Sequence, residues 1–126
     1  MNFPAELKYS KEHEWVKVSG NIATIGITDY AQDSLGDVVY VEVPAVGKEF
    51  SVMQEFGVVE SVKSVSSLYS PVAGKVVERN DSLEKEAVLV NDDPYGKGWI
   101  IKVEMSNPAD LNNLLSAADY QKILHK

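Results

Sequence analysis

The sequence contains no cysteine, so it can form no disulfide and offers no thiolate ligand to a metal ion. It has no apolar run approaching the roughly 20 residues that cross a bilayer as a helix. Basic residues are few: 12 face 19 acidic ones, and the net charge is −7. This balance argues against binding to nucleic acid or to an anionic membrane surface, both of which attract clustered lysine and arginine. We attribute the acidity to solubility, with basic docking patches on partner proteins as a second interpretation.

The first seven residues lack both the charged and the apolar region of a secretory signal, and they are not an arginine-rich transit peptide. We therefore expect a cytoplasmic protein of bacterial origin. The alternative is a processed organellar form, which would lie in the mitochondrial matrix.

Motifs that carry catalysis are absent: there is no Gly-x-Ser-x-Gly, His-Glu-x-x-His or Gly-x-Gly-x-x-Gly. The two histidines, His13 and His125, lie near opposite ends of the chain, which disfavours a metal site or a catalytic triad. For His13 we expect a structural or surface role. Asp29, Asp33 and Asp37 recur at every fourth residue but lack the ligand order of a calcium loop, so they predict a solvated helix face. We expect no catalytic residue and no metal site, and hence a protein that is not an enzyme.

The sequence instead has short β-branched runs separated by turn residues, which predict a mostly β protein. Its length suits a single domain over residues 1–126. Thr28 as N-cap and Gly36 as C-terminal stop predict a short helix between them. We predict a hairpin over 14–27, turning at Ser19-Gly20-Asn21, and strands over 38–43, 74–79, 88–90 and 99–105.

Near the C-terminus the apolar period changes to that of a helix, and a helical segment is predicted over 107–125. Asn107 is a suitable N-cap and Pro108 suits the first helical position, while Ser116 begins a second helical stretch. We expect the apolar residues of this segment to pack on the β core rather than to bind a partner.

The chain is organised around residues 56–79, for which we predict a hairpin. Val58 and Val59 enter the turn, a serine-rich segment with Lys63 forms it, and a valine-rich run over 72–77 leaves it. An exposed lysine is ordinarily only a solvated charge. A lysine at the tip of a stiff hairpin, however, suits covalent attachment of a prosthetic group, because its amine can reach the active site of a modifying enzyme.

The segment Glu60-Ser61-Val62-Lys63, followed by Ser70-Pro71-Val72-Ala73-Gly74, resembles the lipoyl-attachment signature. The surrounding chain resembles the H-protein family of the glycine cleavage system over nearly its whole length. The other segments that carry this resemblance are Tyr9 with His13-Glu14-Trp15-Val16, residues 23–32, Leu35-Gly36-Asp37-Val38-Val39, Pro94-Tyr95 and Gly98-Trp99-Ile100.

The resemblance implies a flattened barrel-sandwich hybrid of the lipoyl- and biotinyl-carrier type, mostly β, with a short helix in its N-terminal half and a C-terminal helical tail. It implies lipoate on Lys63, attached by a lipoyl ligase or a lipoyl/octanoyl transferase. The arm would carry the aminomethyl group of glycine from a PLP-dependent glycine decarboxylase (P protein) to a tetrahydrofolate-dependent aminomethyltransferase (T protein). Reducing equivalents would then pass to dihydrolipoamide dehydrogenase (L protein), and the carrier is expected to be a monomer.

Four residues are assigned as neighbours of the attachment site. Glu60 and Ser61 belong to the attachment turn, where a modifying enzyme would read them, with ordinary turn packing as the alternative. Gly57 and Gly74 are interpreted as backbone positions that permit a close approach or a positive φ.

Glu14 matches a family position implicated in holding the loaded arm in a surface cleft. Its carboxylate would pair there with the ammonium of the cargo, and the alternative is a solvated charge at a strand end. Ser67 stands where some relatives have an acidic residue, so no second carboxylate is expected at that position.

Three other functions are compatible with parts of the sequence. An H-like relay would pass lipoyl groups to other carrier domains without serving glycine oxidation, and the sequence of the carrier alone barely separates this function from the first. A biotin carrier usually has Met-Lys-Met at the tip, whereas Val62 and Ser64 flank the lysine in this chain. The last alternative is an interaction module with no modification.

Overall fold

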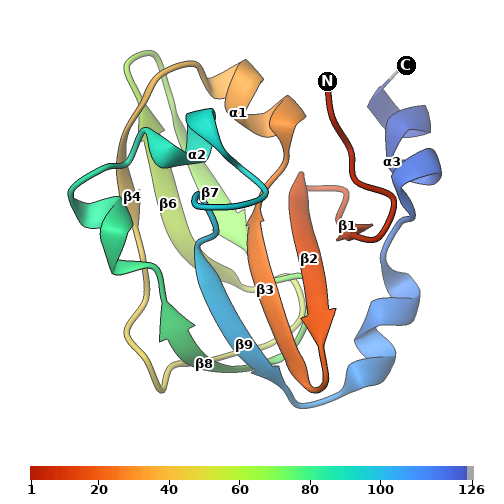
Figure 1. The fold of residues 1–126 in the computed structure, drawn as a ribbon. Helices are drawn as coiled ribbons and strands as arrows, with labels where there is room; N and C mark the ends of the chain where they lie inside the picture. The colour runs from red at the N-terminus through yellow and green to blue at the C-terminus, as the bar shows by residue number, and fades with distance from the viewer. Residues whose placement is uncertain (125–126) are drawn as a thin grey trace.

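The computed structural model describes residues 1–124, whose strands pair antiparallel within two separate sheets (Figure 1). Within these residues the larger sheet has six strands in the order β1-β2-β3-β9-β8-β5, and the smaller has three in the order β4-β6-β7. The strands are β1 (Lys8–Tyr9), β2 (Glu14–Ser19), β3 (Ile22–Ile27), β4 (Val38–Glu42), β5 (Glu49–Phe50), β6 (Glu55–Ser61), β7 (Val65–Tyr69), β8 (Gly74–Arg79) and β9 (Ile101–Met105).

Short helices occupy the connections between the strands and the C-terminal end of the chain. They are the α-helices α1 (Asp29–Leu35), α2 (Leu89–Asp92) and α3 (Ala117–Leu124) and the 3-10 helices η1 (Asp81–Glu84) and η2 (Pro108–Asn113). Within residues 1–124, none of the helices has the length and apolar character needed to cross a bilayer.

The two sheets share one apolar core. Ile25 of β3 and Val103 of β9 face it from the larger sheet, and Val59 of β6 faces it from the smaller one; each is at most 1% exposed. Burying a side chain of this size contributes about 1.5–3 kcal/mol to the free energy of unfolding, so this shared core holds the sheets together. The predicted mostly β barrel-sandwich architecture is confirmed.

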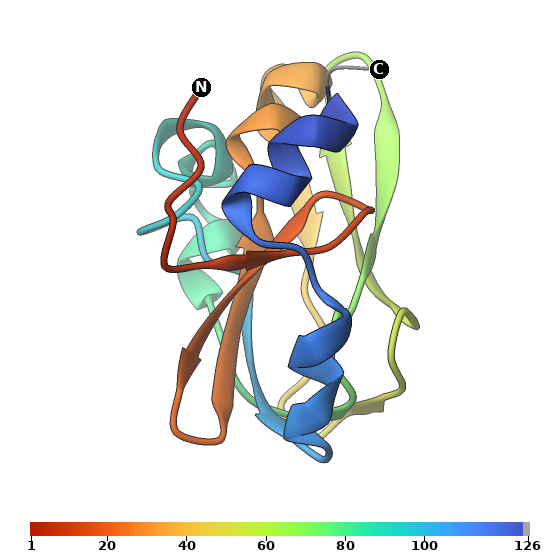
Figure 2. The same ribbon diagram turned by 90° about the vertical axis from the view of Figure 1, so that its right-hand side faces the viewer.

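A second apolar cluster attaches the N-terminal segment and α3 to the outside of the larger sheet (Figure 2). Tyr9 of β1 stacks on Tyr120 of α3 with 4.9 Å between ring centroids, and both side chains are fully buried. Trp15 lies in the same cluster and donates a hydrogen bond from Nε1 to the carbonyl of Pro94 at 2.9 Å. The C-terminal helical segment therefore packs on the β core as predicted; residue 125, the last of that segment, lies outside the described residues.

Local sequence signals gave the correct result for the first hairpin and for α1. Strands β2 and β3 pair from Glu14↔Ile27 to Ser19↔Ile22, and Gly20 in the turn has φ 61°. Thr28 caps α1, because its Oγ accepts a hydrogen bond from the Ala31 amide at 3.2 Å. The positive φ of Gly36, 77°, ends the helix where glycine was expected to end it.

The predicted hairpin over 56–79 is wrong in its second half. Strand β6 pairs with β7, in the register Val59↔Ser66, whereas β8 lies in the other sheet between β5 and β9. The serine-rich segment assigned to the turn is therefore mostly strand. The sequence does not indicate this strand, because β7 lies at the edge of its sheet and only Leu68 is fully buried. Backbone pairing with β6, rather than an apolar pattern, fixes the strand conformation.

The strand predicted over 88–90 is also wrong, because the chain forms α2 there. Val90 is fully buried in the main core, and the side chain of Asn91 ties α1 to β4. Its Nδ2 donates to the carbonyl of Gly36 at 2.8 Å, and its Oδ1 accepts from the amide of Val38 at 2.8 Å. Asn91 makes these contacts from within the helical turn. The strand predicted over 99–105 is shorter, since β9 begins at Ile101.

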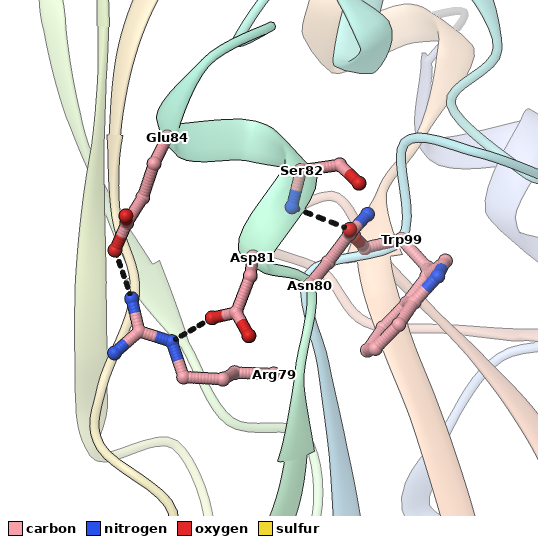
Figure 3. Close-up of polar contacts among 6 residues, drawn as sticks. All are labelled: Arg79, Asn80, Asp81, Ser82, Glu84 and Trp99. Carbon is pink, nitrogen blue, oxygen red and sulfur yellow. Dashed lines mark hydrogen bonds and ion pairs between the residues drawn. The ribbon is translucent and has the colours of Figure 1, made fainter.

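A polar cluster closes the end of β8 (Figure 3). Asn80 is 6% exposed; its Nδ2 donates to the carbonyls of Lys97 and Trp99 at 2.8 and 2.7 Å. Arg79 forms ion pairs with Asp81 and Glu84, both of which are exposed. Exposed pairs of this kind contribute at most about 1 kcal/mol, so the buried amide of Asn80 is the stronger anchor.

Candidate functional site

Lys63 lies at the tip of the β6–β7 hairpin, and its side chain is exposed. The turn is closed by a hydrogen bond from the Ser61 amide to the Ser64 carbonyl at 2.8 Å. The hydroxyl oxygen of Ser61 accepts hydrogen bonds from the amides of Lys63 and Ser64 at 3.3 and 3.1 Å. Ser61 is buried, at 9% exposed, so it shapes the turn from within. A side chain buried in this way holds the backbone of Lys63 in place and leaves its amine accessible.

The hairpin tip is also fixed from outside. The amide of Val62 donates to the carbonyl of Asp37 at 3.0 Å, just after α1. The side chain of Lys63 passes over Gly36, where an added Cβ would lie 3.4 Å from the lysine Cε. The bonds of Asn91 hold the same α1–β4 junction, so Lys63 projects from a rigid surface. Asn91 was missed by the sequence analysis, since a side chain that bridges two elements leaves no local signal.

Of the residues assigned to the attachment turn, the two glycines lie elsewhere. Gly57 lies toward the far end of β6, paired with Leu68, and Gly74 begins β8 in the other sheet. Neither has a positive φ. A Cβ on either would overlap a backbone carbonyl oxygen of the neighbouring strand, that of Glu42 or of Glu104. Both glycines permit close strand approach, one of the two roles expected for them.

Glu60 stays near the lysine. It is half-buried in β6, between Tyr40 of β4 and Val65 of β7 in the strand register. Its carboxylate forms no side-chain hydrogen bond or ion pair in the part of the chain that the structure describes. Its role as a residue read by a modifying enzyme stays a prediction.

A cleft of about 400 Å³ runs alongside β7, away from Lys63. At the end near Lys63 it is lined by Ser64 and by Leu35 of α1, and it extends along β7 to Glu14 at the start of β2. The other residues of the lining are Glu12, His13, Ile27, Tyr30, Ala31, Ser34, Val59 and residues 65–68. Most of this surface comes from α1 and β7, which the sequence does not mark as neighbours.

Glu14 is nearly fully buried, at 1% exposed, so the alternative of a solvated strand-end charge is wrong. Its Oε1 accepts a hydrogen bond from the Ser10 hydroxyl at 2.6 Å, and its Oε2 accepts one from the Tyr69 amide at 3.3 Å. Burial raises the pKa of the Glu14 carboxyl to about 8, against the opposing effect of these two hydrogen bonds. A cation bound in the cleft beside Glu14 would therefore stabilise the ionised form of the carboxyl group and lower its pKa.

We expect Glu14→Gln to remove a pH dependence from the stability of the fold. The unfolded chain releases the Glu14 proton around pH 4.5, whereas the folded chain keeps it to about pH 8. Between these values rising pH favours the unfolded state, by about 4 kcal/mol at most. Urea unfolding at pH 5 and pH 8.5 should show the variant gaining stability relative to the parent at the higher pH. The exposed control Glu86→Gln should show no such change, and an equal change in both variants would contradict the prediction.

His13 forms the wall of the cleft next to Glu14 and has an uncommon backbone conformation, with φ 73°. Its Nδ1 lies 2.7 Å from the hydroxyl of Tyr120, and its ring lies 4.9 Å from that of Tyr30. The sequence analysis gave His13 a structural or surface role. The structure gives it both, because one ring nitrogen is tied to α3 while the residue lines the cleft.

Comparison with known proteins gives one consistent result. A protein-family model described as "Glycine cleavage H-protein" matches residues 7–126. The glycine cleavage system H protein of Symbiobacterium thermophilum is 64% identical over 119 residues, covering 94% of this chain and 93% of the relative. That of Carboxydothermus hydrogenoformans is 62% identical and covers 98% and 95%. The crystal structure of a glycine cleavage system H protein from Mycobacterium marinum matches with a TM-score of 0.90 and 32% identity, over 98% of this chain and 100% of that one.

Proposed function

Because the chain belongs to the glycine cleavage H-protein family, we propose that it is the lipoyl carrier of a glycine cleavage system, with lipoate joined to Lys63 as an amide. The observation that carries this proposal is the position of Lys63, exposed at the tip of a hairpin that Ser61 and the α1–β4 junction hold rigid. A ligase or a lipoyl/octanoyl transferase can reach this amine without unfolding the chain.

The surface beside Lys63 fits the prosthetic group. The cleft along β7 begins at Ser64 and Leu35 and offers apolar side chains such as Val65 and Leu68 to an aliphatic arm. Lipoate supplies a disulfide that can be reduced by two electrons as one of its sulfurs accepts a one-carbon group. It can later release the group and then the two electrons. The chain itself supplies the positioning, and tethering keeps the arm at a high local concentration near each partner.

The partners in this proposal are the enzymes of the system. A PLP-dependent glycine decarboxylase would load the aminomethyl group, and a tetrahydrofolate-dependent aminomethyltransferase would remove it. Dihydrolipoamide dehydrogenase would accept the reducing equivalents. The support for these partners is membership of the family together with the exposed position of Lys63.

Glu14 is proposed to hold the cargo ammonium at the end of the cleft away from Lys63. Its carboxyl is buried, already accepts two hydrogen bonds and keeps its proton to about pH 8, because burial raises its pKa. An ammonium placed beside it would lower that pKa again, so binding the cation would ionise Glu14. A charge pair shielded from water in this way slows the loss of the cargo.

We expect Glu14→Gln to shorten the lifetime of the loaded carrier by roughly tenfold, because an amide cannot pair with a cation as a carboxylate does. The lifetime is measured as release of formaldehyde and ammonia from the isolated loaded protein at pH 7.5. Glu86→Gln, at an exposed position outside the cleft, is the matched control. An unchanged lifetime in Glu14→Gln would remove Glu14 from the proposed site and leave the role of Lys63 intact.

Reconstitution tests the function as a whole. The lipoylated chain is mixed with a glycine decarboxylase, and exchange of labelled bicarbonate into glycine is measured; we expect exchange only with the modified protein. A lipoylated chain that supports no exchange but donates its lipoyl group to other carrier domains would instead be a relay.

A further inference from the structure

Three hydrogen-bonding groups from separate parts of the chain meet behind the cleft. The hydroxyl of Tyr120 on α3 lies 2.7 Å from His13 Nδ1 and 2.8 Å from Thr28 Oγ. Thr28 Oγ also accepts the amide hydrogen of Ala31, as the cap of α1. Thr28 and Tyr120 are both fully buried, so neither hydroxyl can turn to water for a missing partner.

The number of available protons decides which group donates and which accepts in these two hydrogen bonds. The Thr28 hydroxyl has one proton to donate, and within the described residues the acceptor in reach is the Tyr120 oxygen. If Thr28 donates to Tyr120, then Tyr120 donates to His13 Nδ1, and every buried proton has an acceptor. In the reverse direction the Thr28 proton is left without an acceptor, which costs about 1–3 kcal/mol in a buried group. The first arrangement is therefore favoured.

We propose that Thr28 and Tyr120 hold His13 as the neutral tautomer that carries its proton on Nε2, and that Tyr120 is thereby a positioning residue for the cleft. Nε2 has no hydrogen-bond partner among the described residues, nor is it among their buried unpartnered atoms, so it is open to solvent. Since His13 lines the cleft beside Glu14, this tautomer gives the cleft wall an uncharged ring.

The surroundings of His13 agree with a neutral ring. Burial lowers the pKa of His13, against the smaller opposing effect of the Glu12 charge. Tyr30 packs on the ring from α1 and Tyr120 from α3, and neither brings a positive charge; Glu14 follows directly in the chain. The backbone of His13 is bonded on both sides, its amide to the Ser10 carbonyl at 3.1 Å and its carbonyl to the Thr28 amide at 3.0 Å. These bonds fix the left-handed φ and therefore the position of the ring.

The consequence for the cleft rests on the proposed function. An imidazolium in the cleft wall would repel an ammonium held by Glu14, whereas a neutral ring does not. Helix α3 would thus protect the cargo from a distance, by keeping a proton off Nδ1 of His13.

The tautomer is tested on the full chain without lipoate. Long-range nitrogen–proton NMR spectra at pH 7.5 should report a protonated Nε2 and a bare Nδ1 for His13, with the signals of the second histidine identified by His125→Gln. Tyr120→Phe should mix the two tautomers and raise the pKa of His13. Tyr9→Phe, which loses a hydroxyl from the same aromatic stack without touching His13, should change neither. A proton on Nδ1 in the parent, or a tautomer unaltered in Tyr120→Phe, would overturn the proposal.

Two further comparisons keep the test decisive. If Tyr120→Phe does not fold, Thr28→Val, which loses the hydroxyl, should mix the two tautomers. Thr28→Ser, which keeps the hydroxyl, should show the tautomer of the parent. In the loaded carrier, the ratio of the cargo lifetime at pH 6 to that at pH 8 should be lower in Tyr120→Phe than in the parent, by roughly threefold or more, and unchanged in Tyr9→Phe. An equal ratio in the two variants would overturn the role of Tyr120 in the cleft. A chain that takes no lipoate would instead overturn the proposed function, and the ring-nitrogen spectra would still decide the tautomer.

Discussion

Lys63→Arg is expected to abolish attachment of lipoate and, with it, all carrier activity. Arginine keeps the positive charge and the exposed position, but its guanidinium does not lose a proton at physiological pH and cannot form the amide. Because Lys63 lies outside the core, the variant should fold as the parent does. Intact-mass spectrometry after expression with lipoate should give one lipoyl addition in the parent, mapped to Lys63, and none in the variant.

Lys48→Arg is the matched control, since Lys48, like Lys63, is an exposed lysine in a connection between strands. It follows Gly47 in the turn between β4 and β5. It should take up lipoate as the parent does. Modification of the parent at Lys48 or at any other lysine would contradict the proposed function, and so would a lipoyl addition that survives in Lys63→Arg.

Gly57→Ala should destabilise the fold more than any substitution at an exposed glycine. The new Cβ would overlap the backbone carbonyl oxygen of Glu42, the last residue of β4 in its pairing with β6. The two strands would have to move apart at this point, which disturbs the adjacent pairing of Glu42 with Val58. We expect a loss of about 3 kcal/mol or more in the free energy of unfolding and a fall in Tm of about 10 °C, measured by thermal and urea unfolding.

Gly20→Asn is the control for this substitution. Gly20 has φ 61°, no atom lies within 4 Å of the point that a Cβ would occupy there, and asparagine tolerates that conformation. Its cost should stay below about 1 kcal/mol. If Gly57→Ala were no more harmful than Gly20→Asn, the close approach of β4 and β6 would not be the reason for glycine at position 57.

Sequence reasoning succeeded where the cause of a structure is local. Thr28 caps α1 because its hydroxyl accepts an amide hydrogen of the first turn, and Gly36 ends the helix because glycine, which has no Cβ, adopts a positive φ without strain. The β2–β3 hairpin follows from two β-branched runs around Gly20. Lys63, the proposed attachment residue, was singled out by its neighbours in the chain, and the structure places it at an exposed hairpin tip, as expected.

It failed where pairing or packing overrides local preference. Residues 65–69 contain two serines and little apolar pattern, yet they form β7 because β6 supplies hydrogen-bond partners. Residues 88–90 look like a strand, but Val90 fills the core from a helical turn, and Asn91 bonds to Gly36 and Val38 from the same turn. A valine-rich run cannot by itself distinguish the two conformations.

By itself the sequence determined the family and the mostly β class, and it singled out the lysine of the proposed function, since each depends on residue types at short spacings. Only the tertiary structure decided that Glu14 is buried, that α1 and β7 form the walls of a cleft, and that Tyr120 meets His13. Those properties arise between residues up to 107 positions apart, whose encounter depends on the packing of the two sheets and α3. Burial, and with it the pKa of a carboxyl or an imidazole, is therefore a property of the assembled fold and leaves no mark on the residues next to it in the chain.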